Sequence, residues 1–383
     1  MEFEKILAGI KLKTPWLISH MRDLVEMESP SEDPAAVNAA MELAAGWAEE
    51  LGGRVKRHRQ KNFGDVYELR FGPKSSRQKP ILLLGHLDTV WPHGTLKSMP
   101  WRESDGKIHG PGTLDMKAGV VMALTAISVL KELSLLRPVT LLLNSEEEVG
   151  SPISRPITEK LAQESSAVFV LEPAQIIDAK TAALKTARKG IGNYRVHVTG
   201  IASHSGVDFE RGHSAVLELA RQIERISAFT DLRTGLTVNC GVISGGTRSN
   251  VIAAEASTEV DVRIAKASDA KKVDRFFASL KPFDKACKLT VTGGINRPPM
   301  ERKAGTIALF KQAKKLAAQL GFEIAEASTG GGSDGNFTAA LGVPTLDGMG
   351  AVGAGAHATH EHIVTEHLTP RTALLAAMLA TTP

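Results

Sequence analysis

An aliphatic run that ends in two ionisable side chains places the strongest constraint on the fold of this chain. The stretch "ILLLGHLDTV" begins at residue 81 and leads through Gly85 to His86 and Asp88. Uninterrupted aliphatic runs are typical of strands buried on both faces, as in parallel sheets. Because residues two apart on a strand point the same way, we expect His86 and Asp88 on one side of its carboxyl end. By itself, the stretch fits a metal site as well as a solvated strand end with a chance histidine.

Strands and helices alternate around this run, which predicts a mixed, mostly parallel sheet with helices on both faces. Asp33 and Pro34 supply an N-cap and a first-turn proline for one of the helices. The expected helices are 14–28, 34–52, Asp115 to Glu132, about 304–320 and about 370–381. The expected strands are 65–72, 81–85, 139–145, 167–173, 322–327 and 344–350.

The pattern changes near Lys189 and returns near residue 297. In "GNYRVHVTG", the side chains of Tyr194, Val196 and Val198 alternate strictly with polar ones. The order that follows is β-α-β-β-α-β, which is the split, ferredoxin-like arrangement. We therefore expect a discontinuous α/β domain and an α+β domain inserted into it, with the boundaries 1–188 and 298–383 for the first and 189–297 for the second.

Composition excludes several classes of protein. The 383 residues are 43% hydrophobic and 23% charged, which is ordinary for a globular protein with two cores. The net charge of +4, without a basic run interleaved with aromatics, argues against nucleic acid as a partner. The longest apolar segment, "AGVVMALTAISVL", is too short to cross a bilayer, and the N-terminal segment has no apolar signal core. We expect a cytoplasmic protein with no membrane partner, in which Cys240 and Cys287 are reduced thiols.

Acidic and histidine side chains follow the apolar strands at several places in the sequence. Since the carboxyl ends of parallel strands share one edge of a sheet, these side chains are expected to converge. They are His86, Asp88, Asp115, Glu146, Glu147, Glu148, Glu172 and His357. So many converging carboxylates would repel one another unless cations neutralise them. Histidine and carboxylate ligands without cysteine suit zinc, manganese or cobalt.

Seven motifs occur in an order that carries a family resemblance over nearly the whole chain. They are "GHLDTV", "GPGTLDMKAG", "EEVGS", "VLEP", "GIASHSG", "GGTRSNVIAAEA" and "GAHATHEHI". The chain resembles the dinuclear zinc amidohydrolases and metallopeptidases that include glutamate carboxypeptidase, aminoacylase, acetylornithine deacetylase and succinyl-diaminopimelate desuccinylase. The "HGTL" extension and the late "TGGGSD" are most similar to the glutamate carboxypeptidase branch.

The resemblance implies two divalent metal ions in each chain, with zinc expected and cobalt or manganese as alternatives. By this resemblance Asp115 bridges both ions, and a carboxylate has two oxygens to offer. His86 and Glu172 complete one site, and Glu148 and His357 complete the other. The neighbouring His360, His362 and His367 are expected to be exposed or to lie behind the ligands.

The resemblance also implies catalytic roles for three residues. Asp88 orients the ligand His86, Glu147 is the general base that activates a water, and His204 stabilises the tetrahedral oxyanion. Three consecutive glutamates leave the register ambiguous on chemistry alone, and the "EE-x-GS" pattern places Glu146 outside the motif. Taken alone, His204 could also be an ordinary loop histidine.

Substrate-binding roles are implied for Asn250, Arg263, Gly331 and Gly332. A guanidinium such as that of Arg263 is a natural bidentate partner for a carboxylate, although Asn250 and Arg263 could also be ordinary residues of the inserted domain. The loop "TGGGSDGN" could instead cradle a phosphate, but it lacks the lysine of a P-loop. Glu361 also falls at a family position, and the sequence assigns it no role.

The resemblance therefore implies a hydrolase that cleaves an amide or peptide bond beside a free carboxylate, like glutamate carboxypeptidase. An N-acyl amino acid deacylase or a dipeptidase on the same site is the alternative. A metal-free scaffold and a nucleotide-binding protein are hypotheses from other classes; complete retention of the ligands and the lack of a strand–GxGxxG–helix unit argue against them. Relatives dimerise through the inserted lid domain, so we expect a homodimer in which His204 reaches the metals of the partner chain.

Overall fold

A computed structural model describes residues 2–73, 75–178 and 181–383, and the chain divides into two compact units. Unit 1 comprises residues 1–187, 302–329 and 333–383, and unit 2 comprises residues 188–301 and 330–332. The boundaries expected from the sequence, after residues 188 and 297, lie within a few residues of these. The sequence pattern does not predict that 330–332 belong with the inserted unit.

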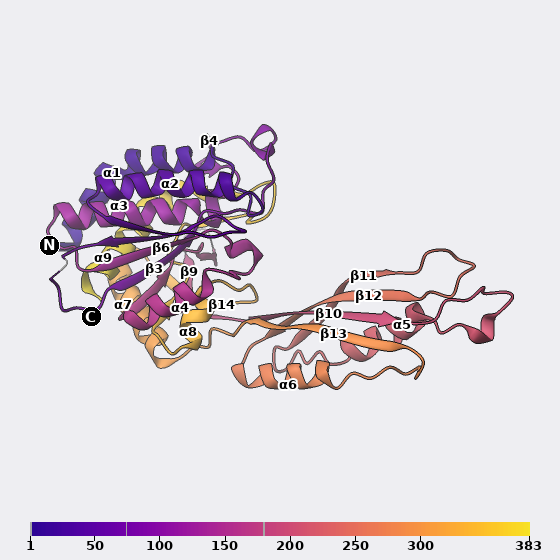
Figure 1. The fold of residues 1–383 in the computed structure, drawn as a ribbon. Coiled ribbons are helices and arrows are strands. Elements are labelled where there is room, and N and C mark those ends of the chain that lie inside the picture. Colours follow the sequence, from indigo (N-terminus) through magenta and orange to yellow (C-terminus); the bar gives the residue numbers. More distant parts are fainter. Residues whose placement is uncertain (1, 74, 179–180) are drawn as a thin grey trace. The chain divides into compact units, whose positions relative to one another are not determined.

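A six-stranded sheet forms the centre of unit 1 (Figure 1). Neighbouring strands run parallel along β6, β3, β7 and β15. At one edge of the sheet, β2 runs antiparallel to β6, and β1 runs antiparallel to β2. The prediction of a mixed, mostly parallel sheet is therefore confirmed. In sheet order the strands are β1 (Arg54–His58), β2 (Val66–Phe71), β6 (Val139–Asn144), β3 (Ile81–His86), β7 (Ala167–Val170) and β15 (Thr345–Leu346).

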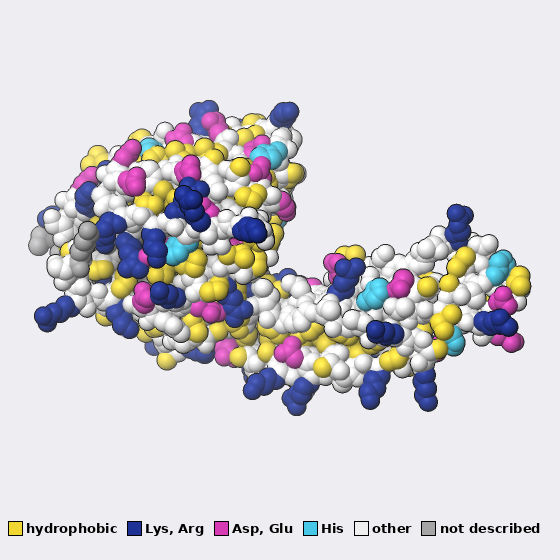
Figure 2. Space-filling model, viewed as in Figure 1, with side chains coloured by type: hydrophobic (Ala, Val, Ile, Leu, Met, Phe, Trp, Pro, Cys, Tyr) yellow, Lys and Arg dark blue, Asp and Glu magenta, His cyan; other side chains and the backbone are white. Residues whose placement is uncertain are grey.

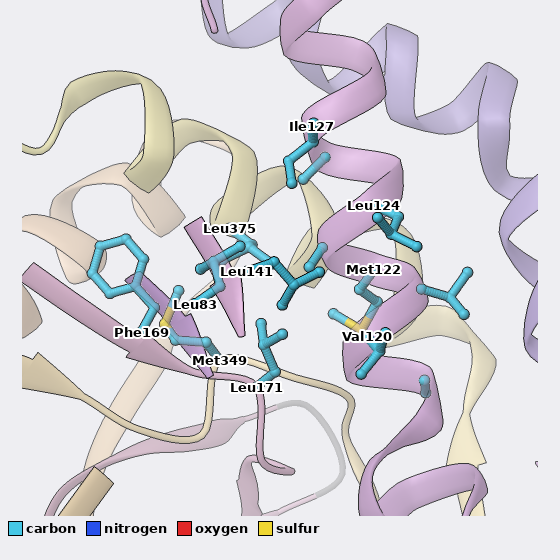
Figure 3. Packing of buried hydrophobic residues seen from close by; sticks show 14 of the residues in the cluster. Leu83, Val120, Met122, Leu124, Ile127, Leu141, Phe169, Leu171, Met349 and Leu375 are labelled. Atoms are coloured by element: carbon cyan, nitrogen blue, oxygen red, sulfur yellow. The ribbon is translucent and has the colours of Figure 1, made fainter. Parts of the chain in front are cut away.

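Helices cover both faces of this sheet, which explains its uninterrupted aliphatic strands. Leu83, Leu141 and Phe169 pack together on one face (Figure 3), in the same hydrophobic cluster as residues of the helices that cover that face. Those helices are α1 (Glu2–Val25), α2 (Pro34–Glu50), α3 (Ala118–Glu132), α7 (Ala304–Gln319) and α9 (Thr365–Thr381). Leu82 and Leu84 face the other side, which is covered by α4 (Arg155–Glu164) and α8 (Gly335–Ala340).

Two helices begin earlier than the sequence predicts. Helix α1 passes through Pro15, and α9 passes through Pro370, although the predictions start these helices at about residues 14 and 370. In α1, Ile6 and Ile10 are buried in the same cluster as Leu17, so one apolar stripe continues across the proline. The packing of this stripe in the core stabilises α1 by more than is lost with the backbone hydrogen bond that Pro15 cannot donate.

Several short elements are not predicted because they lack a clear period. Strands β9 (Ala182–Arg188) and β8 (Gln175–Ile176) are two of them, and they form one small sheet with β14 (Ile324–Thr329), the strand expected at 322–327. A second small sheet contains β16 (Gly353–Ala354), β17 (His362–Val364), β5 (Lys107–His109) and β4 (Arg102–Ser104). The remaining short turns are the 3₁₀ helices Thr95–Lys97, Glu147–Val149 and Phe209–Arg211, and the π turn Thr113–Lys117.

The π turn and α3 together form one apolar segment, Thr113–Glu132. By length and composition alone these 20 residues could cross a membrane, which corrects the expectation that the segment is too short. However, 94% of its most apolar window is buried inside the fold. Its composition is accounted for by its place as the core helix of unit 1.

Unit 2 has the predicted β-α-β-β-α-β order. Its four antiparallel strands are arranged as β11 (Thr237–Gly245), β12 (Glu255–Ile264), β10 (Gly190–Thr199) and β13 (Lys288–Arg297). Helices α5 (Ala215–Ser227) and α6 (Ala267–Ala278) pack over a core that contains Tyr194, Val196 and Val198. The ferredoxin-like arrangement is therefore confirmed, with β11 at one edge of the sheet.

Candidate active site

The parallel strands of unit 1 bring five predicted metal ligands together at one edge of the sheet. His86 is the last residue of β3, and Glu172 follows β7. Glu148 lies in the turn after β6, and Asp115 lies in the π turn before α3. The loop after β16 supplies His357, which has a left-handed backbone with φ of 60°.

Asp115 lies between the two histidines, with one carboxylate oxygen toward each. Its Oδ1 is 3.2 Å from Nε2 of His86, and its Oδ2 is 3.4 Å from Nε2 of His357. Oε1 of Glu172 is 3.7 Å from Nε2 of His86, and Oε2 of Glu148 is 3.1 Å from Nε2 of His357. The five side chains thus form two groups that share Asp115.

These spacings suit ligands of a common ion. A tetrahedral zinc ion with bonds of about 2.0–2.2 Å separates its ligand atoms by about 3.3–3.6 Å. The pairs around His86 and His357 span 3.1 to 3.7 Å, so most lie at or beyond the upper end of ordinary N–H···O hydrogen bonds. Two overlapping clusters have donor atoms close enough to hold an ion: His86 with Asp115 and Glu148, and His86 with Glu147 and Glu172.

The charge of the cluster also favours cations. Burial raises the pKa of Glu148 to about 7, while hydrogen bonds with Asp115 and Glu148 raise the pKa of His357 to about 10. Burial acts against the charged form of His86, but its contacts with Asp115, Asp88 and Glu172 raise its pKa well above the usual value. Protons and imidazolium groups thus balance the carboxylates here, and divalent ions would replace them.

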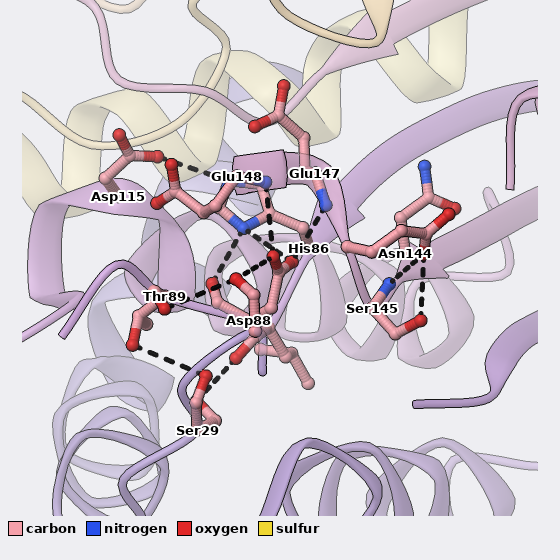
Figure 4. Close-up of polar contacts among 12 residues, drawn as sticks. Ser29, His86, Asp88, Thr89, Asp115, Asn144, Ser145, Glu147 and Glu148 are labelled. Carbon is pink, nitrogen blue, oxygen red and sulfur yellow. Dashed lines mark hydrogen bonds and ion pairs between the residues drawn. The ribbon is translucent and has the colours of Figure 1, made fainter. Parts of the chain in front are cut away.

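Asp88 contacts His86 and also supports the glutamate turn (Figure 4). Nδ1 of His86 is 3.0 Å from the backbone carbonyl of Asp88 and 3.4 Å from its Oδ1. Because a carbonyl only accepts, Nδ1 carries the proton and Nε2 is left to bind a metal. The Asp88 carboxylate also accepts the backbone N–H groups of Glu147 and Glu148, each at 3.2 Å.

The three consecutive glutamates have different surroundings. Glu146 is fully buried and accepts the N–H groups of Ile153 at 3.1 Å and Ser154 at 2.6 Å, so its carboxylate closes the turn. Glu148 lies beside Asp115, whereas the carboxylate of Glu147 lies apart from both in Figure 4. The roles of base for Glu147 and ligand for Glu148 stay predictions.

Asp334 supports the same turn, and sequence reasoning assigns it no role. Its carboxylate accepts hydrogen bonds from Asn144 at the end of β6 and from Ser151, the latter at 2.5 Å. The contact joins the serine of "EEVGS" to the aspartate of "TGGGSD". Both motifs are visible in the sequence, but their pairing depends on the fold.

Among the described residues, neither potential metal cluster includes His357, His360, His362 or His367. Of these four, His357 contacts both Asp115 and Glu148. His362 is buried, and its Nδ1 donates to the carbonyl of His360 at 2.8 Å. His360 is exposed, as predicted for histidines outside the ligand set.

The remaining predicted residues, His204, Asn250, Arg263, Gly331 and Gly332, all belong to unit 2. His204 is exposed, and its Nδ1 accepts N–H groups from Gly206 at 3.1 Å and Val207 at 3.2 Å. The neutral ring therefore carries its proton on Nε2. The carbonyl of Asn250 accepts the N–H of Ser205 at 3.1 Å, which places this loop beside His204.

Arg263 is held by two acceptors. Its Nε and Nη2 each donate to the Asp261 carboxylate at 2.8 Å, and its Nη1 donates to the carbonyl of Gly330 at 3.3 Å. These bonds use three of the five N–H groups of a guanidinium, so one on each Nη remains for a further acceptor. Gly332 permits close packing, because a Cβ there would lie 2.6 Å from Cδ1 of Ile191.

Comparison with known proteins is consistent with this site. The chain is 30% identical over 372 residues to carboxypeptidase G2 of Pseudomonas sp. (strain RS-16), covering 95% of this chain and 88% of the relative. It is 26% identical over 272 residues to acetylornithine deacetylase of Proteus mirabilis, covering 66% of this chain and 68% of the relative.

A solved structure shares the fold. The YXEP protein of Bacillus subtilis, a dinuclear metal-binding peptidase, matches with a TM-score of 0.69 at 16% identity, over 97% of this chain and 98% of that one. The family model of "Peptidase family M20/M25/M40" matches residues 82–381. The chain therefore belongs to peptidase family M20/M25/M40 and is a hydrolase of that family.

Proposed function

We propose that the protein cleaves an amide or peptide bond beside a free carboxylate, with glutamate carboxypeptidase-like specificity, and that it uses two zinc ions. The observation that carries the proposal is Asp115, whose two oxygens face His86 and His357 separately. Glu172 and Glu148 complete the two ligand sets. The similarity to carboxypeptidase G2 supports the choice of substrate class.

The residues of unit 1 divide the chemistry between them. His86, Asp115, Glu148, Glu172 and His357 would hold the divalent ions, which would supply polarisation of the amide carbonyl and a lowered pKa for a water molecule. Glu147 takes the proton of the attacking water and returns it to the leaving nitrogen. Asp88 keeps Glu147 in place through the backbone of the turn and keeps the Nδ1 proton on His86.

The residues of unit 2 supply the donors for the substrate. His204 carries its proton on Nε2, where it can donate to a developing oxyanion. The two remaining Nη protons of Arg263 suit the two oxygens of a substrate carboxylate. Asn250, Gly331 and Gly332 are assigned to the same binding surface.

A product screen tests this function. Zinc-loaded protein is incubated with peptides ending in glutamate, other dipeptides and N-acyl amino acids, and the released amino acids are identified. Release of C-terminal glutamate as the fastest reaction supports the proposal. Faster release of acetate or another acyl group would favour the deacylase alternative, which the similarity to acetylornithine deacetylase supports.

We also propose a homodimer formed through unit 2. The edge strand β11 exposes Val242 and Ile243, and the neighbouring α5 exposes Val216 and Leu217. Hydrophobic side chains are visible on the surface of this unit in Figure 2. An exposed apolar edge strand can pair with a copy of itself.

Mixing inactive His204→Ala subunits with inactive Glu147→Gln subunits tests whether the dimer shares its active sites. If His204 acts on the partner chain, subunit exchange restores part of the activity. No recovery after proven exchange would show that His204 acts within its own chain or has no catalytic role.

A further inference from the structure

We propose that Glu361 is a positioning residue for the metal centre, because its carboxylate joins three chain segments that each carry a candidate ligand or its support. The inference rests on the proposed function, in which His86, Asp115 and His357 bind metal. Glu361 itself is not among the donor groups that could hold an ion in the described part of the chain.

The carboxylate of Glu361 is surrounded by donors and is only 1% exposed. Its Oε1 accepts the backbone N–H groups of Leu114 at 2.8 Å and Asp115 at 3.1 Å. Its Oε2 accepts the indole N–H of Trp91 at 2.9 Å and the backbone N–H of Gly112 at 3.0 Å. Four hydrogen bonds therefore converge on one buried side chain.

These donors belong to segments that are distant in sequence. Trp91 follows the segment of His86 and Asp88, and the three backbone donors belong to the loop that ends at Asp115. Glu361 itself comes four residues after His357. One side chain thus sets the spacing among the segments that supply both histidines and the shared carboxylate.

The loop before Asp115 needs such support because its own backbone is unusual. Gly112 has φ of 69°, and a Cβ on this residue would lie 2.7 Å from Cγ2 of Thr89. The bonds from Gly112 and Leu114 to Glu361 hold this turn from both sides of Thr113. Ligands must be held to within about 0.5 Å for a metal site to keep its geometry.

Only a carboxylate satisfies all four donors. In glutamine one oxygen becomes an NH₂ group, which would face two N–H donors and accept from neither. The buried Lys117 ends the same π turn, and its side chain anchors the turn as well. Lys117 is itself fixed by the carbonyls of Leu24 and Met27, at 2.9 and 2.8 Å.

Metal affinity is the measurement that separates positioning from simple structural support. Chelator-stripped wild-type protein and the Glu361→Gln variant are titrated with zinc against a chromogenic chelator, and the melting temperature is recorded with and without zinc. Loss of a residue that orients ligands typically weakens metal binding about 10- to 100-fold. We expect a loss of this size for Glu361→Gln, together with a smaller rise in melting temperature on adding zinc.

Glu218 provides a matched control in unit 2. It is also 1% exposed and accepts backbone N–H groups, from Phe283 at 3.0 Å and Asp284 at 2.9 Å, but it contacts no candidate ligand. Glu218→Gln should lower the melting temperature of metal-free protein and leave zinc affinity unchanged. An equal loss of zinc affinity in both variants would overturn the inference, because it would reflect general destabilisation.

Trp91→Phe keeps the test decisive if Glu361→Gln does not fold. It removes one donor from Glu361 and leaves the carboxylate in place, so we expect a loss of zinc affinity of a few-fold. Wild-type zinc affinity in Glu361→Gln would overturn the inference but not the proposed function. If only Trp91→Phe folds, wild-type zinc affinity in that variant would have the same meaning. Failure of wild-type protein to bind zinc would overturn the proposed function as well.

Discussion

Unit 1 and unit 2 hold their candidate functional side chains in different ways. In unit 1, His86, Asp115 and Glu172 are largely buried and face one another at the end of a sheet covered on both faces. In unit 2, His204 and Arg263 are exposed or half-buried, and each is fixed by local neighbours. The contrast fits the proposal that the first group binds cations and that the second donates hydrogen bonds to the substrate.

The largest expected effect concerns the two adjacent glutamates of unit 1. Glu147→Gln removes the proposed general base and should lower kcat by at least about 10² while zinc affinity is kept. Glu148→Gln should weaken zinc binding, because it removes a ligand charge. Steady-state kinetics and zinc titration of both variants check this, and an exchange of the two phenotypes would shift the proposed register by one residue.

Removal of metal should distinguish the two units directly. A ligand at 100 times its Kd stabilises the folded state by about 2.7 kcal/mol, and each bound ion adds to this. Chelation should therefore increase hydrogen exchange around His86 and Asp115 in unit 1. Strands β10 and β12 of unit 2 serve as the internal control, and equal loss of protection in both units would show that metal does not stabilise unit 1 selectively.

Arg263→Ala tests whether unit 2 recognises the substrate carboxylate. A hydrogen bond to a charged group contributes about 1.5–3 kcal/mol, so KM for carboxylate-bearing substrates should rise at least about tenfold. Arg233→Ala is a matched control, because the side chain of Arg233 is 89% exposed in the same unit. Unchanged kcat/KM in Arg263→Ala would remove Arg263 from the site.

The remaining prediction concerns the pH dependence of zinc binding. Contacts with Asp115 and Glu148 raise the pKa of His357 to about 10, so in the metal-free protein this ring is protonated at neutral pH. Zinc must displace that proton, and apparent affinity should therefore rise with pH, by up to about tenfold per unit for each proton released. Titrations between pH 6 and pH 9 check the sign, and an affinity that stays flat or falls would contradict it.

Periodicity and motif order were sufficient to predict most of the architecture. The aliphatic runs that lead to His86 and Glu172 identify strands buried on both faces, and the alternation at Tyr194 identifies a sheet covered on one face. These patterns are local, because each reports the surroundings of its own element. The continuation of α1 through Pro15 cannot be predicted from local sequence, because it depends on packing against the rest of unit 1.

For the candidate site, the sequence by itself determined which residue types end the strands, and hence that acids and histidines converge at one edge of a sheet. Only the tertiary structure decided how they are supported. The contacts of Asp88 with the glutamate turn and of Glu361 with the loop of Asp115 join residues 59 to 249 positions apart. No spacing rule specifies such contacts, because their geometry exists only after the separate strands and loops have packed together.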